Sequence, residues 1–79
     1  MTDETPRPGL YQKFRVERIV GTDKPGEQFF VLSPTHDPLA RYALQMYADA
    51  ARDAGLHDLA RDLEDGLRRA RAGEPFYPA

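Results

Sequence analysis

The sequence predicts a small α+β domain in which an antiparallel β-hairpin is followed by a hairpin of two helices, a ββαα arrangement. Two observations lead to this class. Apolar residues alternate with polar ones between residues 10 and 32, whereas after Pro34 they recur with helical spacing. With 79 residues, the chain has room for one domain with one small core.

The β-hairpin is predicted from two short runs separated by turn-forming residues. In residues 10–20, Phe14 and Val16 fall on one face and charged side chains on the other, as expected of a strand. Residues 21–26 are rich in Gly, Asp and Pro and predict a loop, after which residues 28–32 form the returning strand. A sheet of two strands leaves one face and two edges open.

The first helix is predicted over residues 38–54. Asp37 precedes Pro38, and this pair favours a helix start because the carboxylate accepts from free N–H groups while proline suits the first helical position. Gly55 is expected to end the helix. The apolar face is wide, which predicts neighbours on two sides, the β-hairpin and the second helix. It consists of two stripes, Leu39, Ala43, Met46 and Ala50 beside Ala40, Leu44, Tyr47 and Ala51.

The second helix is predicted to begin at His57 or Asp58 and to run to residue 72, with Gly73 ending it. Its outer face carries opposite charges four residues apart, among them Glu64 and Arg68. Gly66 lies in the middle of this helix, where glycine is unfavourable, and therefore indicates a close contact with another backbone. Its buried face is predicted to contain Leu56, Ala60, Leu63, Leu67 and Ala70.

The domain organisation follows from these elements. Residues 1–9 are expected to form a flexible arm, residues 10–73 the single domain and residues 74–79 an extended tail. The net charge of −2, from 11 basic and 13 acidic residues, gives no general attraction to nucleic acids or anionic membranes. Disulfides and thiolate metal sites are excluded because cysteine is absent. No apolar run approaches a membrane span and the first ten residues lack a signal-peptide core, so we expect a cytoplasmic protein.

Two His-Asp pairs are the residues most suggestive of chemistry. His36-Asp37 and His57-Asp58 are compatible with a metal site or a His-Asp phosphohydrolase, but a metal needs three or four converging ligands. We interpret both pairs as helix starts and expect no metal and no cofactor. Ser33 has no nucleophile motif around it, and two strands with two helices offer little space for a cleft. We therefore expect no enzymatic activity.

The basic residues Lys13, Arg15 and Arg18 lie close together beside aromatic residues. Such a cluster is compatible with a surface that binds single-stranded nucleic acid. Glu17 interrupts the cluster, and further acidic residues follow in the loop. Nucleic-acid binding is therefore the alternative function, and the acidic neighbours argue against it.

The outer face of the predicted β-hairpin is the candidate partner-binding surface. Phe29 and Val31 lie on it with Ile19, and Arg15 lies at its rim. Three candidates could cover this face: the Phe76-Tyr77 tail, a second copy of the chain in a homodimer, or another protein. The sequence thus predicts a non-catalytic interaction module that associates with itself or binds and inhibits a host protein through the hairpin face or edge.

A pattern of positions between residues 13 and 63 is shared with a group of other proteins. The positions are 14–18, the turn after Gly21, 30–32, 37–40, 43–44, 47–48 and 59–63. On these residues the stretch, which covers about two thirds of this chain, resembles small uncharacterised proteins from bacteriophages and prophages of GC-rich bacteria. No activity is assigned to that group. The resemblance implies a setting in which small acidic proteins bind and block host proteins.

Overall fold

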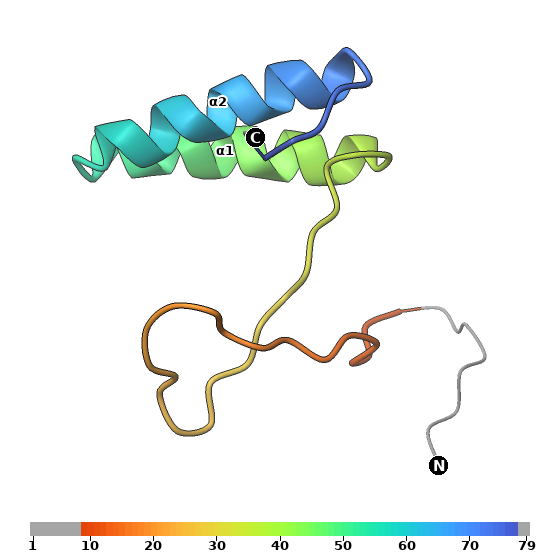
Figure 1. Ribbon diagram of the computed structural model, residues 1–79, viewed down its shortest axis with the longest axis vertical. Helices are drawn as coiled ribbons and strands as arrows, with labels where there is room; N and C mark the ends of the chain where they lie inside the picture. The colour runs from red at the N-terminus through yellow and green to blue at the C-terminus, as the bar shows by residue number, and fades with distance from the viewer. Residues whose placement is uncertain (1–8, 78–79) are drawn as a thin grey trace. The chain divides into compact units, whose positions relative to one another are not determined.

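The computed structural model describes residues 9–77 of the chain and contains two helices, α1 (Pro38–Asp53) and α2 (His57–Arg71), within that range (Figure 1). Figure 1 shows the helices side by side, joined by a short connection. The chain divides into two compact units, Met1–Val31 and Leu32–Ala79. Both helices belong to the second unit, which is a helical hairpin.

The predicted β-hairpin is absent from the described part of the chain. No residue between 9 and 77 is in a strand, so the α+β class and the ββαα arrangement are wrong, and the fold is a small all-helical hairpin. The physical reason lies in how little the two runs bury. Every residue from 12 to 33 is exposed, and a two-stranded ribbon without a covered apolar face is at best marginally stable in water. The alternating pattern is therefore present without the packing that a sheet requires.

The start of α1 follows the local chemistry that predicts it. The Asp37 carboxylate accepts a hydrogen bond from the Leu39 N–H at 3.0 Å, and Pro38 occupies the first helical position. Arg41 then binds the preceding turn, donating through Nε to the Pro34 carbonyl at 2.8 Å and through Nη2 to the Thr35 carbonyl at 3.1 Å. These bonds fix the direction in which the chain enters α1.

Both helices end in the same hydrogen-bonding motif. After α1, the Leu56 N–H donates to the Ala51 carbonyl at 2.8 Å and the Gly55 N–H to the Arg52 carbonyl at 3.0 Å. This pair of bonds defines a Schellman motif, which requires a left-handed residue, and Gly55 has φ +87°. Gly73 repeats the motif after α2, with φ +79°. The predicted roles of both glycines are confirmed.

The core between the helices is built mostly from alanines. Leu67 is the single large side chain that is fully buried among the described residues. Alanine side chains permit close approach of the two backbones, but they remove little apolar area from water. Of the predicted α2 face, Leu63 is half-buried and Leu56 is exposed. The other buried residues of the core are Ala40, Ala48 and Ala51 in α1 and Ala60 and Ala70 in α2.

The segment after α2, residues 74–77, folds back on this helix. A Cβ added to Gly66 would lie 2.8 Å from the Phe76 ring and 2.9 Å from the Phe76 carbonyl oxygen, so the glycine makes room for the tail. Arg69 holds the same segment by donating to the Pro75 carbonyl at 3.2 Å and to the Phe76 carbonyl at 2.9 Å. The close contact predicted at Gly66 is confirmed, and its partner is Phe76.

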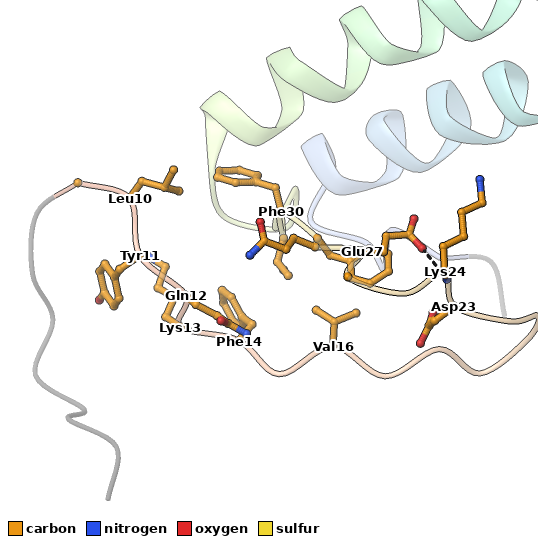
Figure 2. Close-up of a pocket in the computed structure, with 15 residues that line it drawn as sticks. Leu10, Tyr11, Gln12, Lys13, Phe14, Val16, Asp23, Lys24, Glu27 and Phe30 are labelled. Atoms are coloured by element: carbon orange, nitrogen blue, oxygen red, sulfur yellow. Dashed lines mark hydrogen bonds between the residues drawn. The ribbon is translucent and has the colours of Figure 1, made fainter.

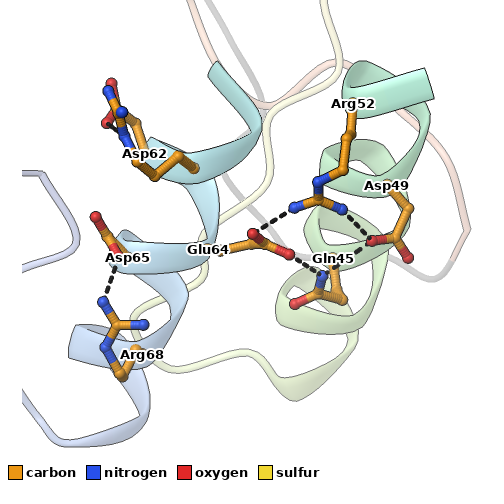
Figure 3. A network of polar contacts seen from close by, with 8 residues as sticks. Gln45, Asp49, Arg52, Asp62, Glu64, Asp65 and Arg68 are labelled. Atoms are coloured by element: carbon orange, nitrogen blue, oxygen red, sulfur yellow. Dashed lines mark hydrogen bonds and ion pairs between the residues drawn. The ribbon is translucent and has the colours of Figure 1, made fainter. Parts of the chain in front are cut away.

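A polar cluster joins the helices on one edge of the hairpin (Figure 3). Glu64 of α2 accepts from Arg52 and, at 3.2 Å, from the Gln45 side-chain amide of α1. Arg52 and Gln45 also donate to Asp49, at 3.4 and 3.3 Å. The bond from Arg52 is the main cause that lowers the pKa of Glu64 below its ordinary value, and the Gln45 bond adds to it. Glu64 therefore pairs across the hairpin with Arg52, whereas Arg68 pairs with Asp65.

This lowered pKa predicts an acid-sensitive contribution to the stability of the hairpin. A carboxyl group whose pKa is lower in the folded state stabilises that state above its unfolded pKa, about 4.3 for glutamate, and the contribution disappears as pH falls through the folded value. We expect Glu64→Gln to lower the urea midpoint at pH 7, with the difference from the original protein shrinking as the pH falls below about 4.3 and disappearing below the folded pKa. Circular dichroism during urea titration at each pH measures this midpoint.

The matched control for this experiment is Asp62→Asn. It also removes one carboxylate from α2, but Asp62 lies 3.8 Å from Arg61 of the same helix and joins nothing to α1. Exposed pairs of this kind contribute little. Equal shifts of the urea midpoint by the two substitutions at pH 7 would show that the bonds of Glu64 to Arg52 and Gln45 do not stabilise the hairpin.

Candidate interaction segment

The N-terminal segment, defined here as residues 10–31, is organised around Arg18. Its guanidinium donates through Nε to the Asp23 carboxylate at 2.6 Å and lies 3.9 Å from Glu27. The bond to Asp23 is the main cause that raises the pKa of Arg18 above its usual value. The same guanidinium stands over the ring of Phe29, 6.0 Å from the centroid. Arg18 therefore ties the first half of the segment to the second.

A tight turn closes the loop between the two halves. The Glu27 N–H donates to the Lys24 carbonyl at 3.2 Å, and the Lys24 N–H donates to the Glu27 carboxylate at 3.3 Å. Pro25 and Gly26 occupy the middle positions, and Gly26 has φ +73°. This is the arrangement of a type II turn, in which proline presets the first position and glycine supplies the positive φ. The loop predicted over residues 21–26 is therefore present without the flanking strands.

The two halves of the segment line an open pocket (Figure 2). Residues 9–14 and Val16 form one side, and residues 23–24 and 26–31 form the other. Its lining includes four aromatic residues, Tyr11, Phe14, Phe29 and Phe30. The Lys13 ammonium stands over the Tyr11 ring, 5.5 Å from the centroid. The segment is thus a loop with apolar side chains along both halves.

The structure separates the four residues predicted to bind a partner into two groups. Phe29 and Val31 line the pocket, whereas Arg15 and Ile19 lie outside its lining. All four are exposed, and Ile19 is 96% exposed. Without a ladder between two strands, nothing aligns these side chains on one common face. Sequence reasoning missed the role of Arg18, although two acidic residues lie within nine positions after it.

The His-Asp pairs lie at the helix starts. Asp37 is the N-cap of α1, and Asp58 lies in the first turn of α2, so the interpretation of both as helix-start residues is confirmed. Between residues 9 and 77, no three His, Cys, Asp or Glu side chains are grouped so that they could hold a metal ion. Neither described helix is long and apolar enough to span a membrane.

Comparison of the chain with protein-family models, with curated proteins and with solved structures finds no match. The resemblance to bacteriophage and prophage proteins therefore stays a prediction.

Proposed function

We propose that the chain is a non-catalytic protein-binding module of the cytoplasm, and that the N-terminal segment binds a partner protein. The observation that carries this proposal is the exposure of its apolar residues. Phe14, Phe29 and Phe30 line one open pocket and are all exposed, on a segment whose backbone forms no ladder in the described structure. Apolar side chains that gather on a surface in this way are typical of interaction sites. A host protein is the partner that the phage resemblance implies.

The chemistry of the segment fits recognition by a partner's sheet. Its extended runs offer backbone N–H and C=O groups, which can pair with an exposed strand edge, while alternate side chains enter pockets. Phe29 and Val31, two residues apart, point to the same side of such an added strand. The bonds of Arg18 to Asp23 and Glu27 already close the loop, which reduces the entropy lost on binding.

Site-specific photo-crosslinking in the source cells tests this proposal. A photoreactive amino acid at Ile19 is expected to give a discrete adduct with one partner protein, and the double substitution Phe29→Ser with Val31→Ser should abolish that adduct. The control position is Arg61, which is exposed on α2. The same adduct from position 61, or an adduct at Ile19 that survives the double substitution, would contradict the assignment of the N-terminal segment.

The alternative function is nucleic-acid binding through Lys13, Arg15 and Arg18. The structure supports it less because Arg18 is already paired with Asp23 and Glu27. Fluorescence anisotropy with a single-stranded oligonucleotide separates the two functions. We expect no binding at 0.1 M salt. Binding that weakens steeply with salt and is lost in Lys13→Ala with Arg15→Ala would replace the proposal by the alternative.

A further inference from the structure

The helical hairpin leaves one apolar stripe of α1 uncovered. The stripe consists of Leu39, Ala43, Met46 and Ala50, and all four side chains are exposed. The face of α1 that packs on α2 is a different one, formed by the buried Ala40, Ala48 and Ala51. At about 100° per residue, the two faces lie about 130° apart around the helix axis. The sequence predicts that α1 has neighbours on two sides, and α2 is the neighbour on one of them.

The stripe has the spacing of a coiled-coil seam. Its residues are separated by four, three and four positions, which is the pattern of the a and d positions in a heptad repeat. Such a seam packs side by side against another helix with the same spacing. Tyr42 and Tyr47 flank it on either side and are also exposed.

The order of large and small side chains makes the stripe complementary to itself. When two copies of α1 are placed antiparallel about a two-fold axis, Leu39 of one copy lies opposite Ala50 of the other. In the same arrangement Ala43 lies opposite Met46. Each layer then combines one large and one small residue, which is how facing positions interdigitate. A two-fold axis repeats every contact, as an isologous dimer requires.

We propose that α1 pairs with α1 of a second copy of this chain through the stripe, in an antiparallel arrangement that joins two hairpins into a four-helix dimer. This interface is separate from the N-terminal segment and does not depend on the function proposed for it.

The exposed area suffices for a specific dimer. Leu39 is 78% exposed, Tyr42 71%, Met46 57% and Tyr47 58%. A leucine or methionine offers about 200 Å² and a tyrosine about 250 Å², so these four side chains present roughly 600 Å² per copy. At full burial of these side chains, two copies would bury about 1,200 Å² in total, which reaches the lower bound for specific protein interfaces.

The first test measures self-association of the full-length chain by sedimentation equilibrium. We expect the original protein to form dimers, and Ala43→Met to weaken them about tenfold or more because the layer at residues 43 and 46 becomes overpacked. The double substitution A43M/M46A exchanges large and small within the layer and should restore dimerisation. If the stripe instead binds any apolar surface without specific packing, for example the N-terminal segment of another copy, Ala43→Met should leave association unchanged or strengthen it. That result would contradict the antiparallel arrangement.

The second test uses the absence of cysteine from the chain. Leu39→Cys and Ala50→Cys variants are prepared separately and oxidised alone and mixed. Residues 39 and 50 are 11 positions apart, about 16 Å along the helix, so an antiparallel pair brings 39 beside 50 and keeps like residues beyond disulfide reach. We expect disulfide-linked dimers in the mixture at far higher yield than in either variant alone. Links formed equally by each variant alone, or an original protein that stays monomeric at millimolar concentration, would overturn the proposal.

Discussion

Replacing Leu67 by alanine is expected to unfold most of the helical hairpin at room temperature. Leu67 is the one large side chain that is fully buried in the described structure, and the rest of the core is alanine. Removing a buried leucine side chain costs about 3 kcal/mol, as lost burial plus the cavity left behind. A hairpin of this size has at most a few kcal/mol of stability. The helical circular dichroism signal at 25 °C and its urea midpoint measure the effect.

Leu59→Ala is the matched control for this substitution. It makes the same chemical change in the same helix, but Leu59 is 41% exposed, so less apolar area is lost and no closed cavity is formed. We expect Leu59→Ala to shift the urea midpoint by less than half as much as Leu67→Ala. Comparable shifts would mean that the stability of the hairpin does not centre on the contact between α1 and α2.

The helix boundaries were predictable because they depend on neighbouring residues. Asp37 binds an N–H two positions away, and Gly55 and Gly73 adopt the positive φ that their own motifs require. Each signal is complete within one turn of helix, so no knowledge of the rest of the fold is needed. The same holds for the turn at Pro25 and Gly26, which forms without strands on either side.

The strands were predicted wrongly because a ladder is not a local property. The alternation around Phe14 and Val16 shows which side chains would share a face, but a strand forms only where a partner and a covered face exist. In this chain the second run lies beyond a loop that Arg18 closes with Asp23 and Glu27. The candidate partner-binding residues Phe29 and Ile19 remain exposed, yet they do not share the face that a sheet would have given them.

For contacts between different elements, the sequence predicts that a residue makes a close contact or an ion pair, but it does not identify the residue on the other side. Gly66 indicated a close approach in the middle of a helix, but nothing in its spacing identifies Phe76, ten residues later. Glu64 was expected to pair with Arg68 one turn away, and the neighbouring helix supplies Arg52 instead. In both cases the position of a second element decides the contact, and that position depends on packing.

Gly66→Ala is expected to release the C-terminal tail from α2. The new Cβ would stand 2.8 Å from the Phe76 ring and 2.9 Å from its carbonyl oxygen, closer than carbon and oxygen atoms approach without displacement. Residues 74–77 belong to no helix, so they move away more easily than α2 does. The bonds from Arg69 to the Pro75 and Phe76 carbonyls are then lost. Backbone order parameters of residues 74–77, measured by NMR relaxation, should fall below about 0.6.

Two opposing effects determine the stability of the Gly66→Ala variant. Alanine in place of glycine within a helix is favourable by about 1 kcal/mol, but at Gly66 the gain is offset by the lost tail contacts. In a Phe76→Ala background the ring no longer packs on α2 and only the carbonyl oxygen of residue 76 still stands against the new Cβ. Gly66→Ala should therefore raise the unfolding free energy there by a larger part of this roughly 1 kcal/mol than it does in the original protein. The difference between the two backgrounds measures the contribution of the docked tail. An equal gain in both would show that Phe76 does not rest on Gly66 in solution.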